Sequence, residues 1–526
     1  MDNLPKTNSD DWSKYSGSYP SDQKTQTPGP QGGSVVENQQ PVNSGAFPAP
    51  QAAVGQEPTP VVTPPPVYVN NPVVDKKADP FVIHESATQP PPPSSNLLKR
   101  IFMFLLLIIL LGALGFGAFK LSGKFLTKNQ PVTLTYWGLW ENEDVLKPAI
   151  DAYKKQHPNV EIVYSRQSHK QYRERLQAAI ERGEGPDIFR FHNTWIPMLA
   201  KDLSPAGSTG YQLQEFQQTF YPVASTDLIV NNKIYGAPLM FDGLALFYNE
   251  DLFKAAGVAV PTTWEEFRKT AQTLTVKNKT GQIITAGAAL GTTNNVEHFS
   301  DILAVMMLQN GADLKNPASR EAQDAITFYH LFVEQPDYTW DETQDNSVIA
   351  FANGKVAMIF APSWQVFAIR STNANLKFQV APIPQLAGTN INWASYWVEG
   401  VSAKSKHSDI AWDFIKFLSQ KEILTQLYTE QSKTRPFGEP YSRVDLAQTL
   451  INDPYVGAYI KEAQTAKSFF LSSRTHDNGI NDRMIKYLED AINSLSKGVS
   501  PESALQTTAK GFSQVLTNFG YPATAP

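Results

Sequence analysis

The chain of 526 residues shows three successive patterns of hydrophobic and polar positions. Residues 1–96 have no sustained apolar period, and residues 101–119 form one unbroken apolar run. From residue 132 onward, short apolar segments alternate with amphipathic ones. Because periods near 2 and near 3.6 are typical of strands and helices, this last pattern predicts a folded α/β domain. The chain is therefore expected to consist of a tail, an apolar segment and a globular domain.

The apolar run IFMFLLLIILLGALGFGAF covers 19 residues without a charge. At about 1.5 Å per residue, a helix of this length matches the ~30 Å hydrocarbon core of a bilayer. Basic residues flank the run on both sides, namely Lys99, Arg100, Lys120, Lys124 and Lys128. We expect a transmembrane helix over 97–121, followed by a linker over 122–131. A secretory signal is disfavoured because about a hundred residues precede the run, although cleavage after insertion stays open.

The segment before the run is rich in proline. Residues 1–96 hold 18 of the 38 prolines, with Gln, Ser, Asn and Thr filling much of the rest. Such a composition buries too little apolar surface to offset the entropy of ordering the chain. We therefore expect a disordered tail that is partly polyproline II, in which PTPVVTPPPV and QPPPPSS serve as spacers or as docking segments.

The globular part begins with alternating strand and helix patterns. VTLTYWG (132–138), NVEIVYSR (159–166) and PDIFRF (186–191) read as strands, and amphipathic segments lie between them. This alternation implies βα units and a largely parallel sheet. In PTTWEEF, Thr263 and Glu266 form a capping box that starts a helix, so Trp264 in this turn is expected to pack.

The amino-acid composition excludes several kinds of partner and functional site. The net charge is −5, the pI is near 6.0 and no basic stripe occurs, so nucleic acid is not an expected partner. The absence of cysteine excludes disulfides, thiolate metal sites and a lipid-modified cysteine. The eight histidines include no i, i+4 pair of the kind found on zinc-binding helices. We expect no metal and no cofactor.

Six segments occur in an order that resembles one known family. They are PDIFRFHNTWIPMLA, KIYGAPLMFDGLALFYNEDLFKAAGV, PTTWEEF, FANGKVAMIFAPSW, VAPIPQ and WVEGVSAKSKHSDIAWDFIKFL. Together they resemble the extracellular solute-binding proteins of family 1, the sugar-binding receptors of ABC importers, which are similar to maltose-binding protein. The resemblance covers residues 132–526.

The resemblance implies a periplasmic-binding-protein-like fold, with two α/β lobes and the ligand in the cleft between them. Lobe one would hold about 132–240 and 396–445. Lobe two would hold about 245–390 and 446–526.

A sugar presents an apolar face of C–H bonds and a rim of hydroxyls. Its receptor therefore needs flat aromatic rings together with carboxylates, amides or arginine. By resemblance, Trp364 in APSW stands where the family presents a sugar-stacking ring, although a packed interface tryptophan is the alternative. Asp242 matches a ligand-contacting carboxylate, or makes a hinge hydrogen bond. Asn193 stands where the family often has an acid, which puts the strength of that contact in doubt.

Two further candidates follow the first predicted strand, Trp140 and Glu141. They lie at a sheet edge of the kind where α/β folds bind ligands. The alternative for Glu141 is a glutamate stabilised at a helix start by the helix dipole. Trp195 is either a sugar platform or core.

A third group precedes the predicted strand WVEGVS. It consists of Trp393, Tyr396 and Trp397, of which Trp397 is the best candidate and one is expected to be core. Arg435 could clamp a hydroxyl or a carboxylate, or form a surface salt bridge.

These features predict a monomer that captures a sugar or oligosaccharide and delivers it to an ABC permease. Flanking charges give no clear positive-inside bias, so orientation follows from function, with the tail in the cytosol and residues 132–526 outside. Two alternatives remain. One is a receptor that signals through its tail. The other is a carbohydrate-active enzyme, which needs two carboxyls about 5–9.5 Å apart. Glu141, Asp242 and Glu399 could supply such a pair, but no segment resembles a glycosidase.

Overall fold

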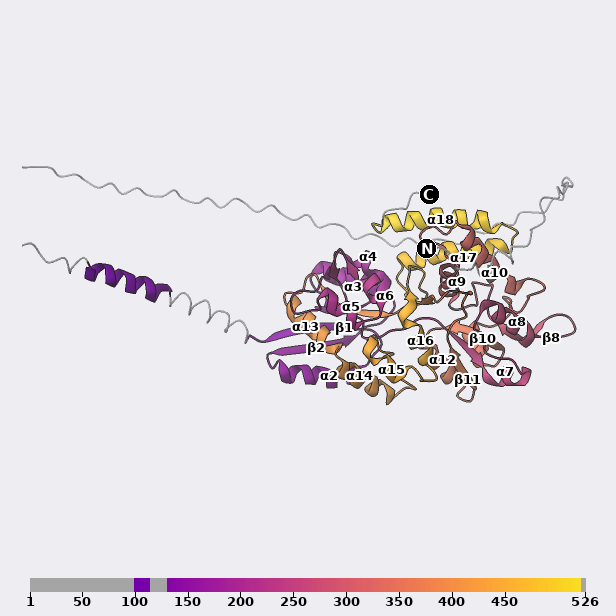
Figure 1. The fold of residues 1–526 in the computed structure, drawn as a ribbon, viewed down its shortest axis with the longest axis horizontal. Helices are drawn as coiled ribbons and strands as arrows, with labels where there is room; N and C mark the ends of the chain where they lie inside the picture. Colours follow the sequence, from indigo (N-terminus) through magenta and orange to yellow (C-terminus); the bar gives the residue numbers. More distant parts are fainter. Residues whose placement is uncertain (1–98, 114–129, 522–526) are drawn as a thin grey trace, which may run out of the picture. The chain divides into compact units, whose positions relative to one another are not determined.

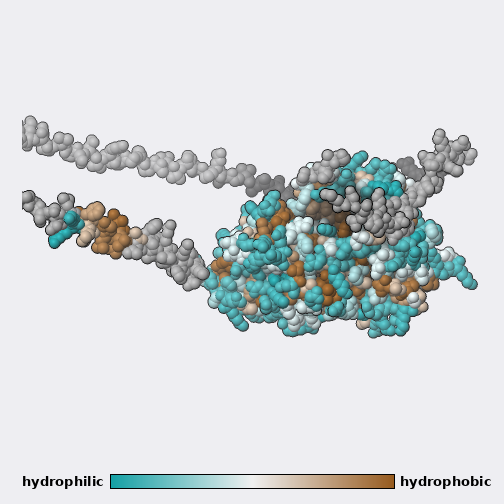
Figure 2. Space-filling model, viewed as in Figure 1, coloured by the Kyte–Doolittle hydropathy of each residue, from teal (hydrophilic) through white to brown (hydrophobic). Residues whose placement is uncertain are grey.

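The computed structural model describes residues 99–113 and 130–521 (Figure 1). Residues 99–113 form a helix with exposed apolar side chains, which stands out as a brown patch in Figure 2. The expected tail over 1–96 and the remainder of the expected membrane segment lie outside the described residues. In the described ranges, no helix combines the length and the apolar character needed to cross a membrane.

The first of two five-stranded sheets has the strand order β2-β1-β3-β13-β4. Strand β1 alternates buried and exposed positions and runs parallel to both β2 and β3, with Val132 opposite Val160 and Tyr136 opposite Ile188. Strand β13 returns antiparallel to β3 from far along the chain. The strands are β1 (Val132–Gly138), β2 (Val160–Arg166), β3 (Ile188–His192), β4 (Leu203–Ser204) and β13 (Trp397–Ser402). The strands expected over 132–138, 159–166 and 186–191 are thereby confirmed.

Seven helices accompany this sheet, and together with it they form what we call the first lobe. They are α2 (Glu143–Gln156), α3 (Tyr172–Arg182), α4 (Ile196–Leu199), α5 (Leu213–Thr219), α6 (Pro222–Leu228), α13 (Ser408–Leu418) and α14 (Lys421–Ser432). A short 3-10 helix, Asn193–Trp195, directly follows β3. A small hairpin of β5 (Ile229–Val230) and β6 (Lys233–Ile234) follows α6.

The second sheet has the order β11-β7-β10-β9-β8. It is mixed, because β10 runs antiparallel to β7 and parallel to β9. Its strands are β7 (Ala245–Asn249), β8 (Val276–Lys277), β9 (Ile283–Ala288), β10 (Val356–Ala361) and β11 (Phe378–Ala381). At the start of α8, Thr263 Oγ1 accepts from Glu266 N, and the Glu266 carboxylate accepts from Thr263 N, which confirms the capping box. Trp264 is fully buried, as expected.

The helices around this sheet form the second lobe with it. They are α7 (Glu250–Ala256), α8 (Trp264–Leu274), α9 (Phe299–Gln309), α10 (Arg320–His330), α11 (Ser347–Ala352), α12 (Gln365–Thr372), α17 (Ile480–Leu495) and α18 (Pro501–Asn518). Helices α17 and α18 lie side by side (Figure 1). The remaining α-helices and strands of residues 130–521 are α15 (Ala447–Leu450), α16 (Gly457–Glu462), β12 (Asn392–Trp393) and β14 (Ala466–Lys467). The two lobes occupy opposite ends of the folded unit (Figure 1).

Chain crossings join the lobes. The segment before β7 leaves the first lobe, and the segment before β13 returns to it. These two crossings touch, since Gly243 pairs with Ala394 in an isolated bridge. A Cβ on Gly243 would lie 2.1 Å from the carbonyl oxygen of Trp393, so a side chain there would force the crossings apart. The close approach explains why this position is glycine.

Candidate functional site

A cavity of about 440 Å³ opens where segments of both lobes meet. Trp140 and His169 follow β1 and β2, and His192 ends β3, so the cavity lies at the carboxyl edge of the parallel strands. Ligands of α/β proteins commonly bind at this edge. The second lobe contributes the turn into α12 and the start of α9. Its lining side chains include Glu297, His298, Asp301, Trp364 and Phe367.

The first-lobe wall is aromatic. Trp140 and Trp397 meet edge to face with ring centroids 5.6 Å apart, and Trp140 also lies 5.7 Å from the ring of His169. Trp397 begins β13 and packs edge to face on His192 and Trp195. The rings of Trp397 and His169 thus hold Trp140 in place, while 40% of its surface stays exposed.

The second-lobe wall carries a matching indole. Trp364 follows strand β10, which is buried along its whole length, and immediately precedes α12; its side chain is 42% exposed. Trp140 and Trp364 are the two tryptophans among residues 130–521 that are classed as exposed, and both line the cavity. Large aromatic rings are normally buried or partnered, so two exposed indoles on opposite walls indicate a ligand surface.

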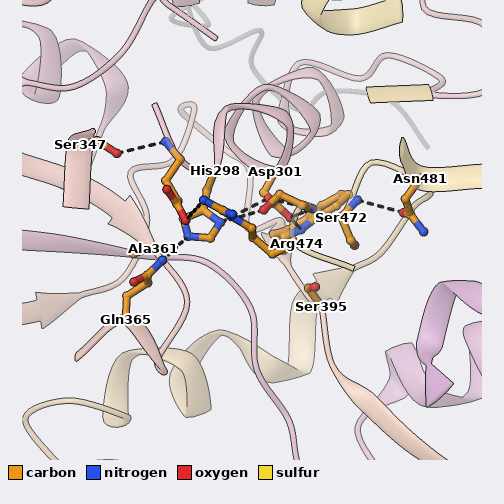
Figure 3. A network of polar contacts seen from close by, with 12 residues as sticks. His298, Asp301, Ser347, Ala361, Gln365, Ser395, Ser472, Arg474 and Asn481 are labelled. Atoms are coloured by element: carbon orange, nitrogen blue, oxygen red, sulfur yellow. Dashed lines mark hydrogen bonds and ion pairs between the residues drawn. The ribbon is translucent and has the colours of Figure 1, made fainter. Parts of the chain in front are cut away.

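Behind Trp364 lies a polar network around His298 (Figure 3). Gln365 Nε2 donates to His298 Nε2 over 3.1 Å, so the other ring nitrogen, Nδ1, is the one that donates to Ser473 Oγ over 2.7 Å. Asp301 accepts from Trp393 Nε1 over 2.7 Å and from Ser473 N over 3.2 Å. The network therefore links three segments of the second-lobe wall, namely the start of α9, the start of α12 and the segment before α17.

Asp242 lines the cavity from a crossing segment. One carboxylate oxygen accepts from Gly243 N and Ser363 N over 2.8 and 3.1 Å, and the other accepts from Ser363 Oγ over 2.9 Å. Burial raises the pKa of Asp242 to about 7, and the three hydrogen bonds only partly oppose this shift. Asp242 therefore lines the cavity and also fixes the crossing to the Trp364 turn by hydrogen bonds, while its contact with a ligand stays a prediction.

Tyr396 reaches the cavity from the second crossing. Its hydroxyl donates to Asp227 Oδ2 over 2.7 Å, and the same oxygen accepts from Asn193 Nδ2 over 2.8 Å. Burial raises the pKa of Asp227 to about 6. Asn193 also accepts from Tyr396 N through its side-chain oxygen. Asn193 thus positions Tyr396 and does not line the cavity.

Of the nine residues expected to bind the ligand, six line the cavity. They are Trp140, Asp242, Trp364, Tyr396, Trp397 and Arg435. Their contact with a ligand stays a prediction. Trp393 and Tyr396 are both 2% exposed, but Trp393 is absent from the cavity lining and is the core member of that group.

The structure places Glu141, Asn193 and Trp195 elsewhere. Trp195 is 1% exposed and packs on Tyr172 and Trp397, so its core interpretation holds. Glu141 is 6% exposed and accepts from Arg190, which also donates to Glu399 over 2.9 Å. Burial alone would raise the pKa of Glu141, but the charge and hydrogen bond of Arg190 hold it below its usual value. The expectation that Glu141 faces the cleft is corrected by this buried ion pair.

The ion pairs of Arg190 also remove two of the carboxylates that the glycosidase alternative would need. Glu141 and Glu399 both belong to the Arg190 cluster and are absent from the cavity lining, so only Asp242 of the three named carboxylates reaches it. Across residues 99–113 and 130–521, no three His, Asp or Glu side chains are placed to hold a metal ion.

Several lining residues were missed from the sequence. They are His169, His192, Met240, Glu297, His298, Asp301, Phe367, Ser395, Glu439, Ser473, Arg474 and His476. Glu439 could have been found, because it lies four residues after Arg435 and pairs with it. The segments around His298 and Ser473 carry no motif and meet only in the folded chain.

Comparison with known proteins agrees with this architecture. The chain is 25% identical over 343 residues to the "Multiple sugar-binding protein" of Streptococcus mutans, covering 61% of this chain and 80% of that protein. It is 24% identical over 395 residues to the "Galactooligosaccharide-binding protein" of Bacillus subtilis, covering 72% and 85%. A crystal structure of a cyclo/maltodextrin-binding protein complexed with maltotetraose superposes with a TM-score of 0.60 at 19% identity, covering 74% and 98%, and shows the two-lobed fold.

A family described as "Bacterial extracellular solute-binding protein" matches residues 139–423, which is more than half of the chain. This range includes the second sheet, both crossings and every strand of the first sheet except β1. The chain belongs to the family of bacterial extracellular solute-binding proteins.

Proposed function

We propose that this protein captures a sugar or oligosaccharide in the cavity between its lobes and delivers it to an ABC permease. The observation that carries the proposal is the pair of exposed indoles, Trp140 and Trp364, on opposite walls of a cavity with polar groups between them. Indoles suit the C–H face of a sugar ring, and carboxylate, tyrosine and arginine groups suit its hydroxyls. Relatives named for sugar and oligosaccharide binding support the same class of ligand.

The ligand contacts that we propose are the six lining residues from the sequence analysis. Trp140, Trp364 and Trp397 supply apolar rings, Asp242 and Tyr396 supply oxygens, and Arg435 supplies donors. Asp242 is held at neutral pH near the midpoint of its titration, with its pKa about 7, so it can accept from or donate to a hydroxyl. A hydroxyl partner buried in this way favours ligands that present the matching group.

We further propose that the apolar run over residues 101–119 holds the protein in the membrane with the 132–526 domain outside. Its 19 uncharged residues suffice for a bilayer, and the chain has no cysteine that could carry a lipid anchor. A receptor for an external solute must reach that solute. The proline-rich residues 1–96 then lie in the cytosol.

A thermal-shift screen tests the binding function. The fragment over residues 132–526 is heated with sugars, polyols and amino acids, because a ligand that binds only the folded state raises stability by RT ln(1 + [L]/Kd). We expect shifts for a subset of saccharides and none for the amino acids. A screen in which only amino acids raise the midpoint would contradict a sugar receptor.

A further inference from the structure

The cavity contains two permanently charged cations, Arg435 and Arg474, and no lysine among its lining residues. Each arginine already has an acidic partner on the same wall. Arg435 Nη2 lies 2.9 Å from Glu439 Oε1, and the two side chains are 24% and 21% exposed. Arg474 Nη2 forms an ion pair with Glu297 Oε1, and the Glu297 side chain is only 10% exposed. Both positive charges are therefore neutralised in the ligand-free site.

The two remaining acids of the cavity have no arginine partner. Asp242 accepts from Gly243 and Ser363, and Asp301 accepts from Trp393 and Ser473, all of which are neutral donors. An anionic ligand entering this site meets no unpaired arginine and faces two carboxyl groups. Like charges brought together in a partly buried site are unfavourable, so such a ligand is repelled.

An uncharged sugar fits the same groups well. Arg435 Nε and Nη2 are both buried and have no hydrogen-bond partner among the described residues, so the 2.9 Å contact of Nη2 with Glu439 is an ion pair without an aligned hydrogen bond. The guanidinium also lies 5.1 Å above the ring of Phe367, which keeps it against the cavity wall. A hydroxyl oxygen can accept from Arg435, and hydroxyl protons can be donated to Asp242 and Asp301.

We infer that the site selects against anionic saccharides, and that Glu439 and Glu297 are the residues that exclude them by neutralising the two cavity arginines. The inference rests on the proposed function and specifies its ligand. Recognition of phosphate or carboxylate in proteins typically uses the planar fork of an arginine. Here the charge of each arginine is already balanced by an ion pair with a glutamate.

The test is isothermal titration calorimetry on the full-length chain in detergent at pH 8, where histidine is ordinarily uncharged. The uncharged probes are maltose, cellobiose, mannobiose and maltotriose. The anionic probes are digalacturonate and maltose 6-phosphate. We expect the best uncharged probe to bind at least about tenfold more tightly than either anionic probe, which corresponds to about 1.4 kcal/mol.

Glu439→Gln and Glu297→Gln then free the arginines one at a time. Each is expected to improve the affinity for an anionic probe about tenfold, since hydrogen bonds to a charged group contribute about 1.5–3 kcal/mol. The matched control is Asp445→Asn, which breaks an ion pair of 2.9 Å with Arg443 away from the cavity and should leave every affinity unchanged. Thermal midpoints of all variants confirm that they are folded.

The outcomes separate the two proposals. If digalacturonate or maltose 6-phosphate binds the wild-type chain as tightly as the best uncharged probe, the inference is overturned while sugar binding stands. The inference also falls if folded Glu439→Gln and Glu297→Gln chains gain no anion affinity. If no saccharide of any charge binds, the proposed function and the inference fail together.

Discussion

The indole of Trp364 and the imidazole of His298 meet edge to face, with ring centroids 5.8 Å apart and ring planes at 78°. His298 is itself fixed on both sides, by Gln365 and by Ser473. An indole that is 42% exposed is therefore held in one orientation by a buried neighbour. A surface that is both exposed and rigid is what a binding site needs, because little ordering remains to be done when the ligand arrives.

Trp364→Ala tests this ring directly. We expect ligand affinity to fall by about 1–3 kcal/mol with little change in the free energy of unfolding, because water can fill the gap at a cavity wall. Calorimetry with a saccharide from the screen gives the affinity, and denaturant unfolding gives the stability. The control is Trp195→Ala, which removes an indole that is 1% exposed and should cost about 3–5 kcal/mol of stability. A collapse of stability in Trp364→Ala without loss of affinity would make Trp364 a structural residue.

Glu141→Gln tests the corrected position of Glu141. Removing one carboxylate from the Arg190 cluster leaves a buried guanidinium with Glu399 as its remaining acidic partner. Breaking a buried ion pair typically costs about 3–5 kcal/mol of stability. We expect the unfolding midpoint to drop while the affinity of the folded fraction stays at the wild-type value. A loss of affinity at unchanged stability would return Glu141 to the binding site.

Asp242→Asn tests the protonation of the crossing segment. The folded chain binds this proton up to a pKa of about 7, whereas the ordinary value is 3.8, so the proton stabilises the fold fully below pH 3.8. This contribution is lost as the pH rises toward 7. The asparagine of the variant does not titrate, so the variant does not lose this stability. Its free energy of unfolding relative to wild type should therefore increase steadily between pH 4 and pH 7.

Denaturant unfolding of both chains across this pH range measures the difference. Asp227 has a pKa raised in the same direction, but it is present in both chains and cancels. Parallel stability curves would show that Asp242 titrates near its ordinary value in the folded chain.

How far the sequence predicts this protein depends on how local each feature is. Strand β1 shows its alternation within seven residues, and the capping box of α8 needs only Thr263 and Glu266. Trp364 and Asp242 lie in segments with a recognisable family pattern. The strand and the capping box are confirmed, and Trp364 and Asp242 line the cavity, because the determining contacts lie close together in the chain or in a known motif.

The features that were missed depend on distant partners. Arg190 and Glu141 are 49 residues apart, and nothing near Glu141 signals that a guanidinium will neutralise it. Ser473 and Asp301 are 172 residues apart and meet only in the folded chain. Tertiary partners of this kind decide whether a polar residue faces a ligand or is buried in an ion pair or hydrogen bond within the protein.

Membrane topology has its own test. Protease added to intact cells should remove the 132–526 domain and leave a small fragment that carries the proline-rich tail, because the apolar run separates the two sides. Antibodies against each end identify the fragments on a gel. Survival of the domain together with loss of the tail would invert the orientation.

The most direct measurement of the central claim, that a sugar sits between Trp140 and Trp364, is a calorimetric titration of the Trp140→Ala/Trp364→Ala double variant. The titrant is the saccharide that gives the largest thermal shift with wild type. Loss of both stacking surfaces is expected to lower affinity by at least about 2 kcal/mol, roughly thirtyfold, at an unchanged unfolding midpoint. An affinity equal to that of wild type in the folded double variant would show that the sugar binds somewhere else.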